Sequence, residues 1–116
     1  MRAPRPTPGK RSSKYGNHEV TYFGHTFPSK KEGNRYLVLR DMVRRTVIKD
    51  LVLHPKFEFV VNGVKVGRYT ADFSYRDKSG DLIVEDVKSE ATRRARDWPL
   101  RRNLMLACFG ITVREI

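Results

Sequence analysis

Cysteine is almost absent from this chain of 116 residues, and Cys108 is its single example. One thiol excludes a disulfide framework and a cysteine-based zinc site within the chain. Cys108 lies in the apolar run 106–109, so we expect a buried core thiol in a reducing cytosol. No apolar run approaches the roughly 20 residues that span a bilayer, and the basic N-terminus lacks the apolar core of a secretory signal. We therefore expect a cytoplasmic protein without a membrane partner.

Acidic residues are also few, 13 against 24 lysines and arginines, which gives a net charge of +11. Such an excess attracts polyanions, of which nucleic acid is the commonest. A basic ribosomal-type surface, or a merely soluble one, is the alternative. The sequence contains no glycine-rich phosphate loop, Walker pattern or Ser-His-Asp set. Its three histidines lack metal-ligand spacing, and His54-Pro55 is typical of the chain just before a strand.

We expect a flexible basic arm over residues 1–17 and a single domain over residues 18–116. The first 15 residues contain three prolines, five basic residues and no acid. Extra contacts with phosphates and a leader without function are equally good interpretations of the arm. The remaining chain is long enough to bury a core without a disulfide or a structural metal.

Local patterns predict the first half of the domain. Residues 18–27 suggest a short strand or hairpin, and Ser29 with Glu32 forms a capping box that begins a helix. Asn62-Gly63 predicts a tight turn between strands Leu51–Val61 and Val64–Tyr75, because both turn residues need a positive φ. The helix carries an apolar stripe, which consists of Tyr36, Leu39, Val43 and Val47.

The register of that hairpin predicts which face of its strand carries Asp72. A two-residue turn pairs residue 61 with 64, 59 with 66 and 57 with 68. On this register Asp72 shares one face with Phe57, Phe59, Val64 and Val66, unless a bulge at Gly67 shifts the pairing. A carboxylate on an otherwise apolar face is costly unless it is paired or bound to a metal.

The second half is predicted to add a strand, a helix and a strand. Leu82–Lys88 is the expected third strand, after a turn at residues 77–80, and Ile111–Ile116 is the last. The last strand should lie parallel to the third through a right-handed crossover. The whole is an α/β fold with an αβββαβ core, in which helices flank a mixed central sheet.

The helix between these two strands should begin near Asp97, with Pro99 in its first turn and Gly110 just beyond its end. Trp98 is expected in the core or in a dimer contact rather than as a platform for base stacking. The inner stripe of the helix is predicted to contain Leu100, Leu104 and Ala107 or Cys108.

Asp86 and Lys88 are two residues apart in the third strand, so their side chains point the same way. Glu85 and Val87 point the other way. Antiparallel pairing of the second and third strands brings Asp72 near Asp86. A carboxylate pair beside an ammonium at the end of a central strand suits phosphodiester hydrolysis. The acids would hold Mg²⁺ or Mn²⁺, and the lysine would act on the attacking water.

Glu32 adds a third carboxylate, because it lies on the core-facing stripe of its helix. Basic residues nearby in the sequence are expected to hold DNA phosphates. They are Lys30, Lys31, Arg35, Arg93, Arg94 and Arg96.

Each of these residues also has a structural interpretation. Asp86 and Lys88 can be a charged pair at a strand end, and Asp72 can pair with Arg68 or with an arginine of the last helix. Glu32 can serve only its capping box, an interpretation at least as good as the catalytic one. The conjunction of three acids and a lysine in one αβββαβ order, in a strongly basic chain, favours the site.

The sequence resembles the PD-(D/E)XK nuclease superfamily at Asp72, at Asp86-Val87-Lys88 and at Glu32. It departs from the pattern at Ala71, which stands where that superfamily often has proline. It is also similar to short, phage- and prophage-encoded relatives of archaeal-type Holliday junction resolvases. The stretches that carry this likeness are 27–32, 54–58, 69–73 and 84–88.

This resemblance implies a homodimer that makes paired symmetric nicks in branched DNA with Mg²⁺ and leaves 5′-phosphate ends. By the same resemblance, Glu32, Asp72, Asp86 and the Val87 carbonyl would bind the metal, and Lys88 would act on the water. Ser89 would contact the scissile phosphate. A nicking or restriction-like enzyme on ordinary duplex and a non-catalytic nucleic-acid-binding module remain as alternatives.

Overall fold

The computed structural model describes residues 18–88 and 97–116. These residues form a mixed α/β structure with two helices and a mixed sheet, which confirms the predicted fold class. The predicted basic arm, residues 1–17, lies outside the described residues. The chain forms two compact units, one that ends at Val38 and one that spans Leu39–Ile116. The single domain over residues 18–116 stays a prediction.

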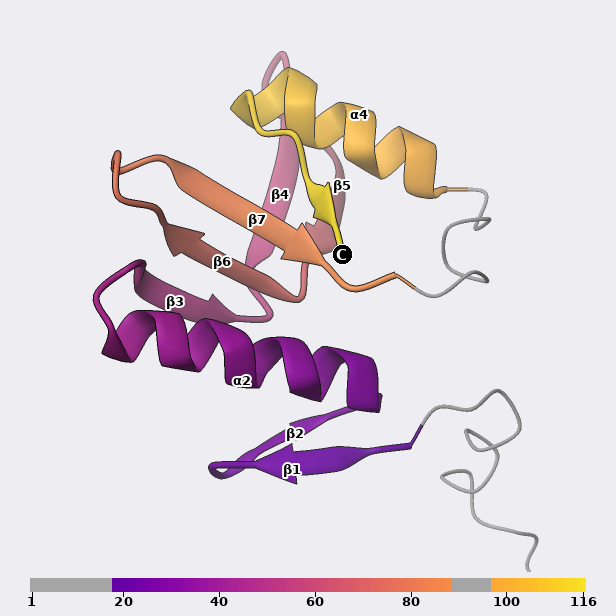
Figure 1. Ribbon diagram of the computed structural model, residues 1–116. Helices are drawn as coiled ribbons and strands as arrows, with labels where there is room; N and C mark the ends of the chain where they lie inside the picture. The colour runs from indigo at the N-terminus through magenta and orange to yellow at the C-terminus, as the bar shows by residue number, and fades with distance from the viewer. Residues whose placement is uncertain (1–17, 89–96) are drawn as a thin grey trace, which may run out of the picture. The chain divides into compact units, whose positions relative to one another are not determined.

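The first unit contains the predicted short hairpin and the start of the first helix. Strands β1 (Val20–Tyr22) and β2 (His25–Phe27) pair antiparallel (Figure 1). Helix α2 (Lys30–Arg44) follows. The Ser29 hydroxyl oxygen accepts a hydrogen bond from the Glu32 N–H at 3.1 Å, so Ser29 is the N-cap that the sequence predicts.

The second unit is built on a four-stranded sheet in the order β3-β6-β7-β8 (Figure 1). The first three strands pair antiparallel, and β8 lies parallel to β7, as predicted. β7 lies between two neighbouring strands, as expected of a central strand, and its residue Val84 is fully buried. The strands are β3 (Lys49–Leu53), β6 (Phe73–Arg76), β7 (Leu82–Asp86) and β8 (Arg114–Glu115).

The two long strands predicted around Asn62-Gly63 are each divided in two. Strands β4 (Lys56–Val61) and β5 (Val64–Thr70) form a separate hairpin. The predicted turn is confirmed, with φ of 51° at Asn62 and 78° at Gly63. The break between β3 and β4 falls at His54, which has a φ of 54° and precedes a proline.

The register predicted for this hairpin is wrong beyond its first pair. Val61 pairs with Val64, but β5 contains one extra residue at Val66, so Phe59 pairs with Gly67. This is the bulge at Gly67 that would shift the pairing, and it turns the following residues to the opposite face. The side chains of Val64 and Val66, predicted on the apolar face, are exposed. The apolar face predicted for Asp72 does not form, because Asp72 lies between β5 and β6 rather than within a strand.

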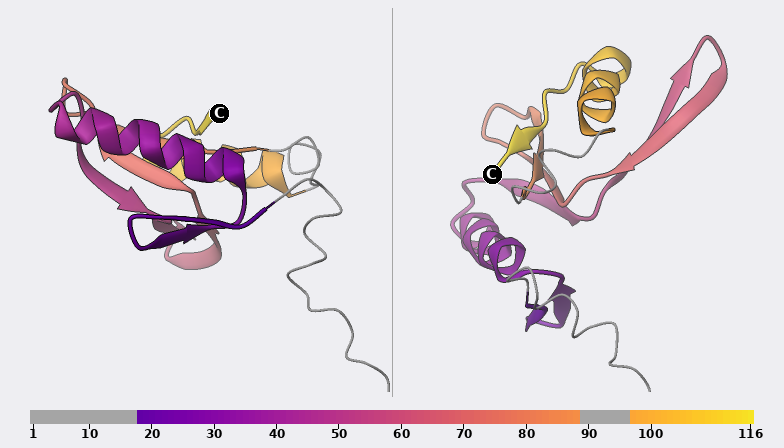
Figure 2. Two further views of the ribbon diagram at one scale, coloured as in Figure 1. Left: turned by 60° about the horizontal axis from the view of Figure 1, so that its bottom comes forward. Right: turned by 90° about the vertical axis from the view of Figure 1, so that its right-hand side faces the viewer.

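Helix α4 (Trp98–Phe109) lies alongside the β4–β5 hairpin (Figures 1 and 2). Asp97 is its N-cap residue, and Gly110 ends it with a φ of 70°, as predicted. The predicted inner stripe is only partly right. Leu100 is 60% exposed and Ala107 is exposed, whereas Trp98 and Met105 are buried.

The buried stripe of α4 passes through Trp98 and Met105. Leu104 and Cys108 flank it and are half-buried. Cys108 is therefore less covered than the sequence predicts. Trp98 is in the core, as expected. The core cluster consists of Phe59, Tyr69, Ala71, Val84, Trp98, Met105 and Val113. Among the described residues, neither helix combines the length and the apolar character needed to cross a membrane.

Candidate active site

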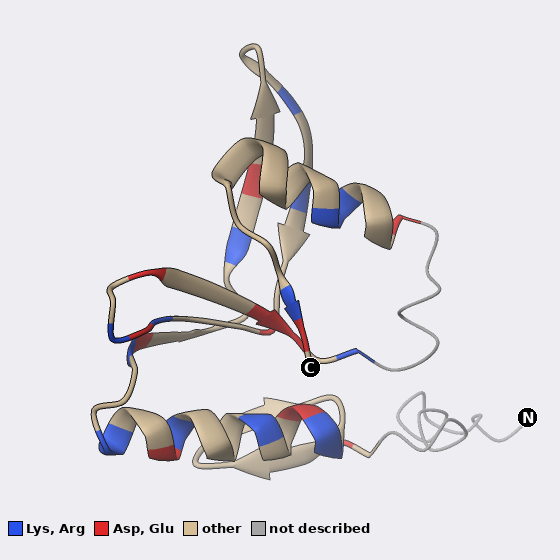
Figure 3. Cartoon of the chain, turned by 45° about the horizontal axis from the view of Figure 1, so that its top comes forward, with Lys and Arg blue, Asp and Glu red and all other residues tan. Residues whose placement is uncertain are grey.

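The end of strand β7 holds a buried ion pair. Asp86 is the last residue of β7, and its Oδ2 lies 2.8 Å from Nζ of Lys88. Only 7% of the Asp86 side chain and 11% of the Lys88 side chain are exposed. Figure 3 shows the acidic residues that gather where β7 ends. The predicted side-by-side placement of these two side chains is confirmed, and their burial separates them from an ordinary solvated surface pair.

Two aromatic side chains contact this pair. The Tyr69 hydroxyl donates a hydrogen bond to Oδ2 of Asp86. Nζ of Lys88 lies 3.7 Å from the centroid of the Trp98 ring, which is a cation–π contact. The two rings lie 5.6 Å apart. Sequence analysis did not assign Tyr69 to the site, because it is 17 residues from Asp86 and only the folded hairpin brings it there.

Tyr69 remains a hydrogen-bond donor. Burial raises the pKa of its phenol far above the usual value, and the hydrogen bond to Asp86 raises this pKa further. The negative charges of Asp86, Asp72 and Glu115 act in the same direction. The phenol therefore stays protonated over the whole physiological range of pH.

Asp72 is tied to the end of β7 by two hydrogen bonds. Its Oδ2 accepts the Val87 N–H at 2.7 Å, and its own N–H donates to the Glu85 carbonyl oxygen at 3.2 Å. The expected approach of Asp72 to the Asp86 segment thus occurs through the antiparallel β6–β7 pair, in which Phe73 faces Glu85. This antiparallel pairing is the predicted route, and the backbone of β7 holds Asp72 there.

His54 also lies beside Asp72, although its spacing in the sequence did not indicate a metal ligand. The His54 N–H donates to the Asp72 carbonyl oxygen at 2.9 Å. A side-chain nitrogen of His54 and a carboxylate oxygen of Asp72 lie within 4.8 Å of each other. The pairing of β3 with β6 creates this proximity. The described residues thus include side chains that could together hold a metal ion, and their composition suits several divalent ions.

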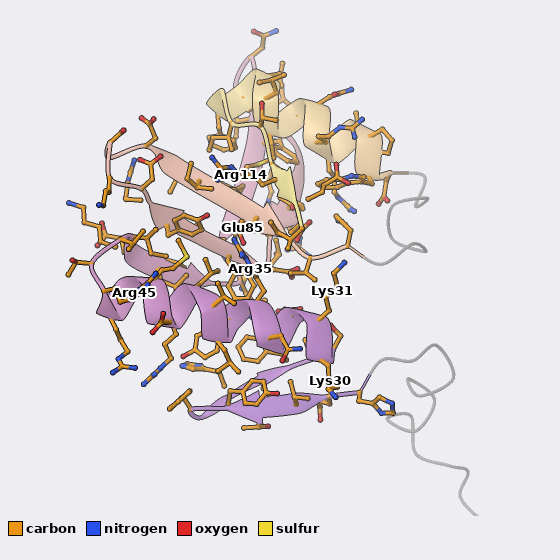
Figure 4. All side chains as sticks on the ribbon, viewed as in Figure 1. Lys30, Lys31, Arg35, Arg45, Glu85 and Arg114 are labelled. Carbon is orange, nitrogen blue, oxygen red and sulfur yellow. The ribbon has the colours of Figure 1, made fainter. Side chains whose placement is uncertain are left out.

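Glu85 lies on the other side of β7, as the alternation of a strand predicts. It is fully buried, and its Oε2 accepts a hydrogen bond from the Tyr75 hydroxyl at 2.6 Å. Figure 4 labels it between strands β6 and β7. Glu85 and Asp86 are therefore both buried but have different hydrogen-bond partners, Tyr75 and Tyr69.

The remaining predicted site residues divide into two groups. In the first unit, Glu32 is 4% exposed in the first turn of α2, and its N–H takes part in the cap at Ser29. Lys30 and Lys31 are exposed and Arg35 is half-buried on the same helix (Figure 4). The predicted phosphate contacts Ser89, Arg93, Arg94 and Arg96 lie outside the described residues.

Comparison with known proteins assigns the chain to a family. Neither the curated proteins nor the solved structures contain a match to this chain. A match to one protein family covers residues 12–109, which is most of the chain. The chain therefore belongs to the family described as "Protein of unknown function (DUF1064)".

Proposed function

We propose that this protein is a metal-dependent DNA endonuclease of the PD-(D/E)XK type that cuts branched DNA, as a Holliday junction resolvase does. The observation that carries the proposal is the buried Asp86–Lys88 pair at the end of a central strand. Its oxygen–nitrogen distance is 2.8 Å, and Asp72 is bonded to the next backbone N–H. Two carboxylates and an ammonium at one strand end are a suitable set for hydrolysing a phosphodiester.

The chemistry of the donor set fits a divalent cation. The carboxylates of Asp72 and Asp86 and the carbonyl of Val87 are hard oxygen donors of the kind that Mg²⁺ and Mn²⁺ take. His54 adds a nitrogen donor beside Asp72, and imidazole suits Mn²⁺ better than Mg²⁺. Glu32 is a further carboxylate that the resemblance to the PD-(D/E)XK superfamily implies. A bound cation neutralises phosphate charge and lowers the pKa of a coordinated water.

The side chains of the chain itself have separate tasks. Lys88 donates hydrogen bonds through its ammonium, which orients the attacking water and offsets negative charge in the transition state. Lys30 and Lys31, exposed on α2, bind backbone phosphates, and the net charge of +11 attracts DNA over longer distances.

A homodimer would present two such sites to two opposed strands. The β4–β5 hairpin exposes four valines, Val60, Val61, Val64 and Val66, which an interface between copies would cover. Paired nicks in branched DNA would serve recombination in the cytoplasm of a phage-infected or prophage-bearing bacterium. A nicking or restriction-like activity on ordinary duplex would need the same residues.

A second candidate is a nucleic-acid-binding module without catalysis. It is favoured by the contacts of Asp86, whose charge is already compensated by Lys88 and by the Tyr69 hydroxyl. In that case the acids stabilise the end of β7 and hold no metal.

Cleavage of a labelled synthetic four-way junction, beside linear duplex of the same sequence, tests the proposal. Reactions contain Mg²⁺, Mn²⁺ or EDTA, and the variants are Asp72→Asn and Asp86→Asn. Glu58→Gln is the matched control, because it also removes one acidic charge, from a side chain that is 64% exposed on β4.

We expect paired nicks on the junction that are lost with EDTA and in both site variants, while DNA binding and the control variant remain active. Equal cutting of linear duplex would support nuclease activity but contradict the assignment as a junction resolvase. Full activity of Asp86→Asn would contradict the site. Tight binding without any cleavage would establish the non-catalytic module.

A further inference from the structure

One oxygen of the Asp86 carboxylate carries both contacts that its side chain makes within the described residues. The Tyr69 hydroxyl and the Lys88 ammonium both reach Oδ2. A carboxylate oxygen that already faces two donors has little capacity left for a third partner. Oδ1 would therefore be the oxygen that holds a cation at Asp86, and the two contacts on Oδ2 fix the orientation of the carboxylate.

Tyr69 is well placed to hold that orientation. It is 6% exposed, and its ring lies 6.3 Å from the Phe57 ring and 5.6 Å from the Trp98 ring. A ring packed on both sides cannot change rotamer without disturbing the core. Its hydroxyl therefore remains aimed at Oδ2 of Asp86.

Trp98 restrains the other partner. A lysine side chain has a flexible four-carbon stem and samples several rotamers when only its tip is held. Here the ammonium lies against the face of a buried indole on one side and against Asp86 on the other. Indole is the aromatic ring that attracts cations most strongly. Nε1 of Trp98 is buried without a hydrogen-bond partner among residues 18–88 and 97–116, so in this part of the chain only its ring makes a polar contact.

We propose that Tyr69 and Trp98 are positioning residues of the Asp86–Lys88 site. Tyr69 fixes which oxygen of Asp86 is presented to a divalent cation, and Trp98 fixes the ammonium that acts on the water. Neither touches the cation or the DNA; each acts through the charged residue that it contacts. The role in hydrolysis rests on the proposed nuclease function, whereas the restraint on Lys88 can be measured without it.

Tyr69→Phe is the main test, and Tyr75→Phe is its matched control. Each substitution removes one buried hydroxyl that donates to a carboxylate, at Asp86 in one case and at Glu85 in the other. A hydrogen bond to a charged group that acts in the transition state is worth about tenfold to a hundredfold in rate. We expect Tyr69→Phe to lower kcat on a four-way junction by this factor, at saturating Mg²⁺, with KM for DNA unchanged. We expect Tyr75→Phe to leave kcat within about twofold of wild type.

Trp98→Phe and Trp98→Leu extend the test to the lysine. Phenylalanine keeps a weaker aromatic face for the ammonium, and leucine keeps only apolar volume. We expect kcat to fall in the order wild type, Trp98→Phe, Trp98→Leu, with KM unchanged.

A second readout does not need cleavage. Trp98 is the only tryptophan of the chain, so its fluorescence reports on the ammonium 3.7 Å from its ring. Lys88→Met removes the ammonium, so its spectrum gives the emission of Trp98 without the cation–π contact. Tyr69→Phe removes one restraint on the Asp86 carboxylate and so on Lys88, which is paired with it. The Trp98 emission of this variant should therefore move toward that of Lys88→Met, while Tyr75→Phe keeps the wild-type spectrum. Addition of Mg²⁺ should change the emission of the wild type in a saturable way and leave that of Asp86→Asn unchanged.

The outcomes are distinguishable. Wild-type kcat and emission in Tyr69→Phe would overturn the inference, and so would an equal loss of kcat in Tyr75→Phe, which would show a general effect of packing. If the wild-type protein cuts no DNA, the proposed function fails. The fluorescence alone then tests whether Tyr69 and Trp98 restrain Asp86 and Lys88. An emission of Tyr69→Phe that moves toward Lys88→Met would then support the restraint, and an unchanged emission would refute it.

Discussion

Lys88→Met should destabilise the protein strongly, because it leaves the buried Asp86 carboxylate without its ammonium. The two side chains are only 11% and 7% exposed, so solvent compensates little. Breaking a buried ion pair by removing one partner costs about 3–5 kcal/mol. The Tyr69 hydroxyl still supports the carboxylate, which favours the lower end, about 3 kcal/mol. For a domain of this size that corresponds to a fall in Tm of more than about 10 °C.

Urea denaturation followed by circular dichroism measures this cost, and a double-mutant cycle assigns it. Asp86→Asn combined with Lys88→Met removes both charges of this pair, so the double variant should lie within about 1 kcal/mol of wild type. Asparagine can still accept the hydrogen bond from Tyr69. A single variant within about 0.5 kcal/mol of wild type, or a double variant equal to the sum of the two single ones, would refute the reasoning.

Three further predictions follow from the contacts described above. Because the pKa of the Tyr69 phenol is raised on folding, the stability it contributes is fully present below about pH 10 and declines above it by about 1.4 kcal/mol per pH unit. The unfolding free energies of wild type and Tyr69→Phe should therefore converge between about pH 10 and 11, and parallel curves would contradict the shift. Gly33→Ala should destabilise the first unit by about 1–3 kcal/mol, because the new Cβ would lie 2.8 Å from the Tyr22 ring and closer still to Val20. Hydrogen exchange of the β1–β2 amides measures this effect, and unchanged protection would refute it. Glu32→Gln should slow junction cleavage less than Asp86→Asn does; unchanged activity would mean that Glu32 serves only the start of its helix.

Several features of the fold were readable from neighbouring residues. Ser29 caps α2, Asn62-Gly63 forms the hairpin turn, and Gly110 ends α4, because each depends on backbone conformations set within a few residues. The same locality explains why Asp86 and Lys88 were correctly placed side by side. Strand periodicity alone points both side chains the same way.

Other features depended on register and long-range packing. One extra residue at Val66 moved the hairpin pairing by one position, and Asp72 lies between two strands rather than on an apolar strand face. The face of α4 was misjudged at Leu100, because helical periodicity in the sequence does not show which stripe meets the core, and here Trp98 and Met105 are buried instead. A shift of one residue reverses every side chain in a strand, so small local irregularities overrule sequence periodicity.

The sequence by itself determined the charge, the element types and the acid–lysine pair at the end of β7. Only the tertiary structure decided what surrounds that pair. Tyr69 and Trp98 reach it from a distant strand and helix, and the β3–β6 pairing brings His54 to Asp72. Contacts between residues far apart in the chain leave no periodic signal, because they form only once the strands have paired and the helix has packed.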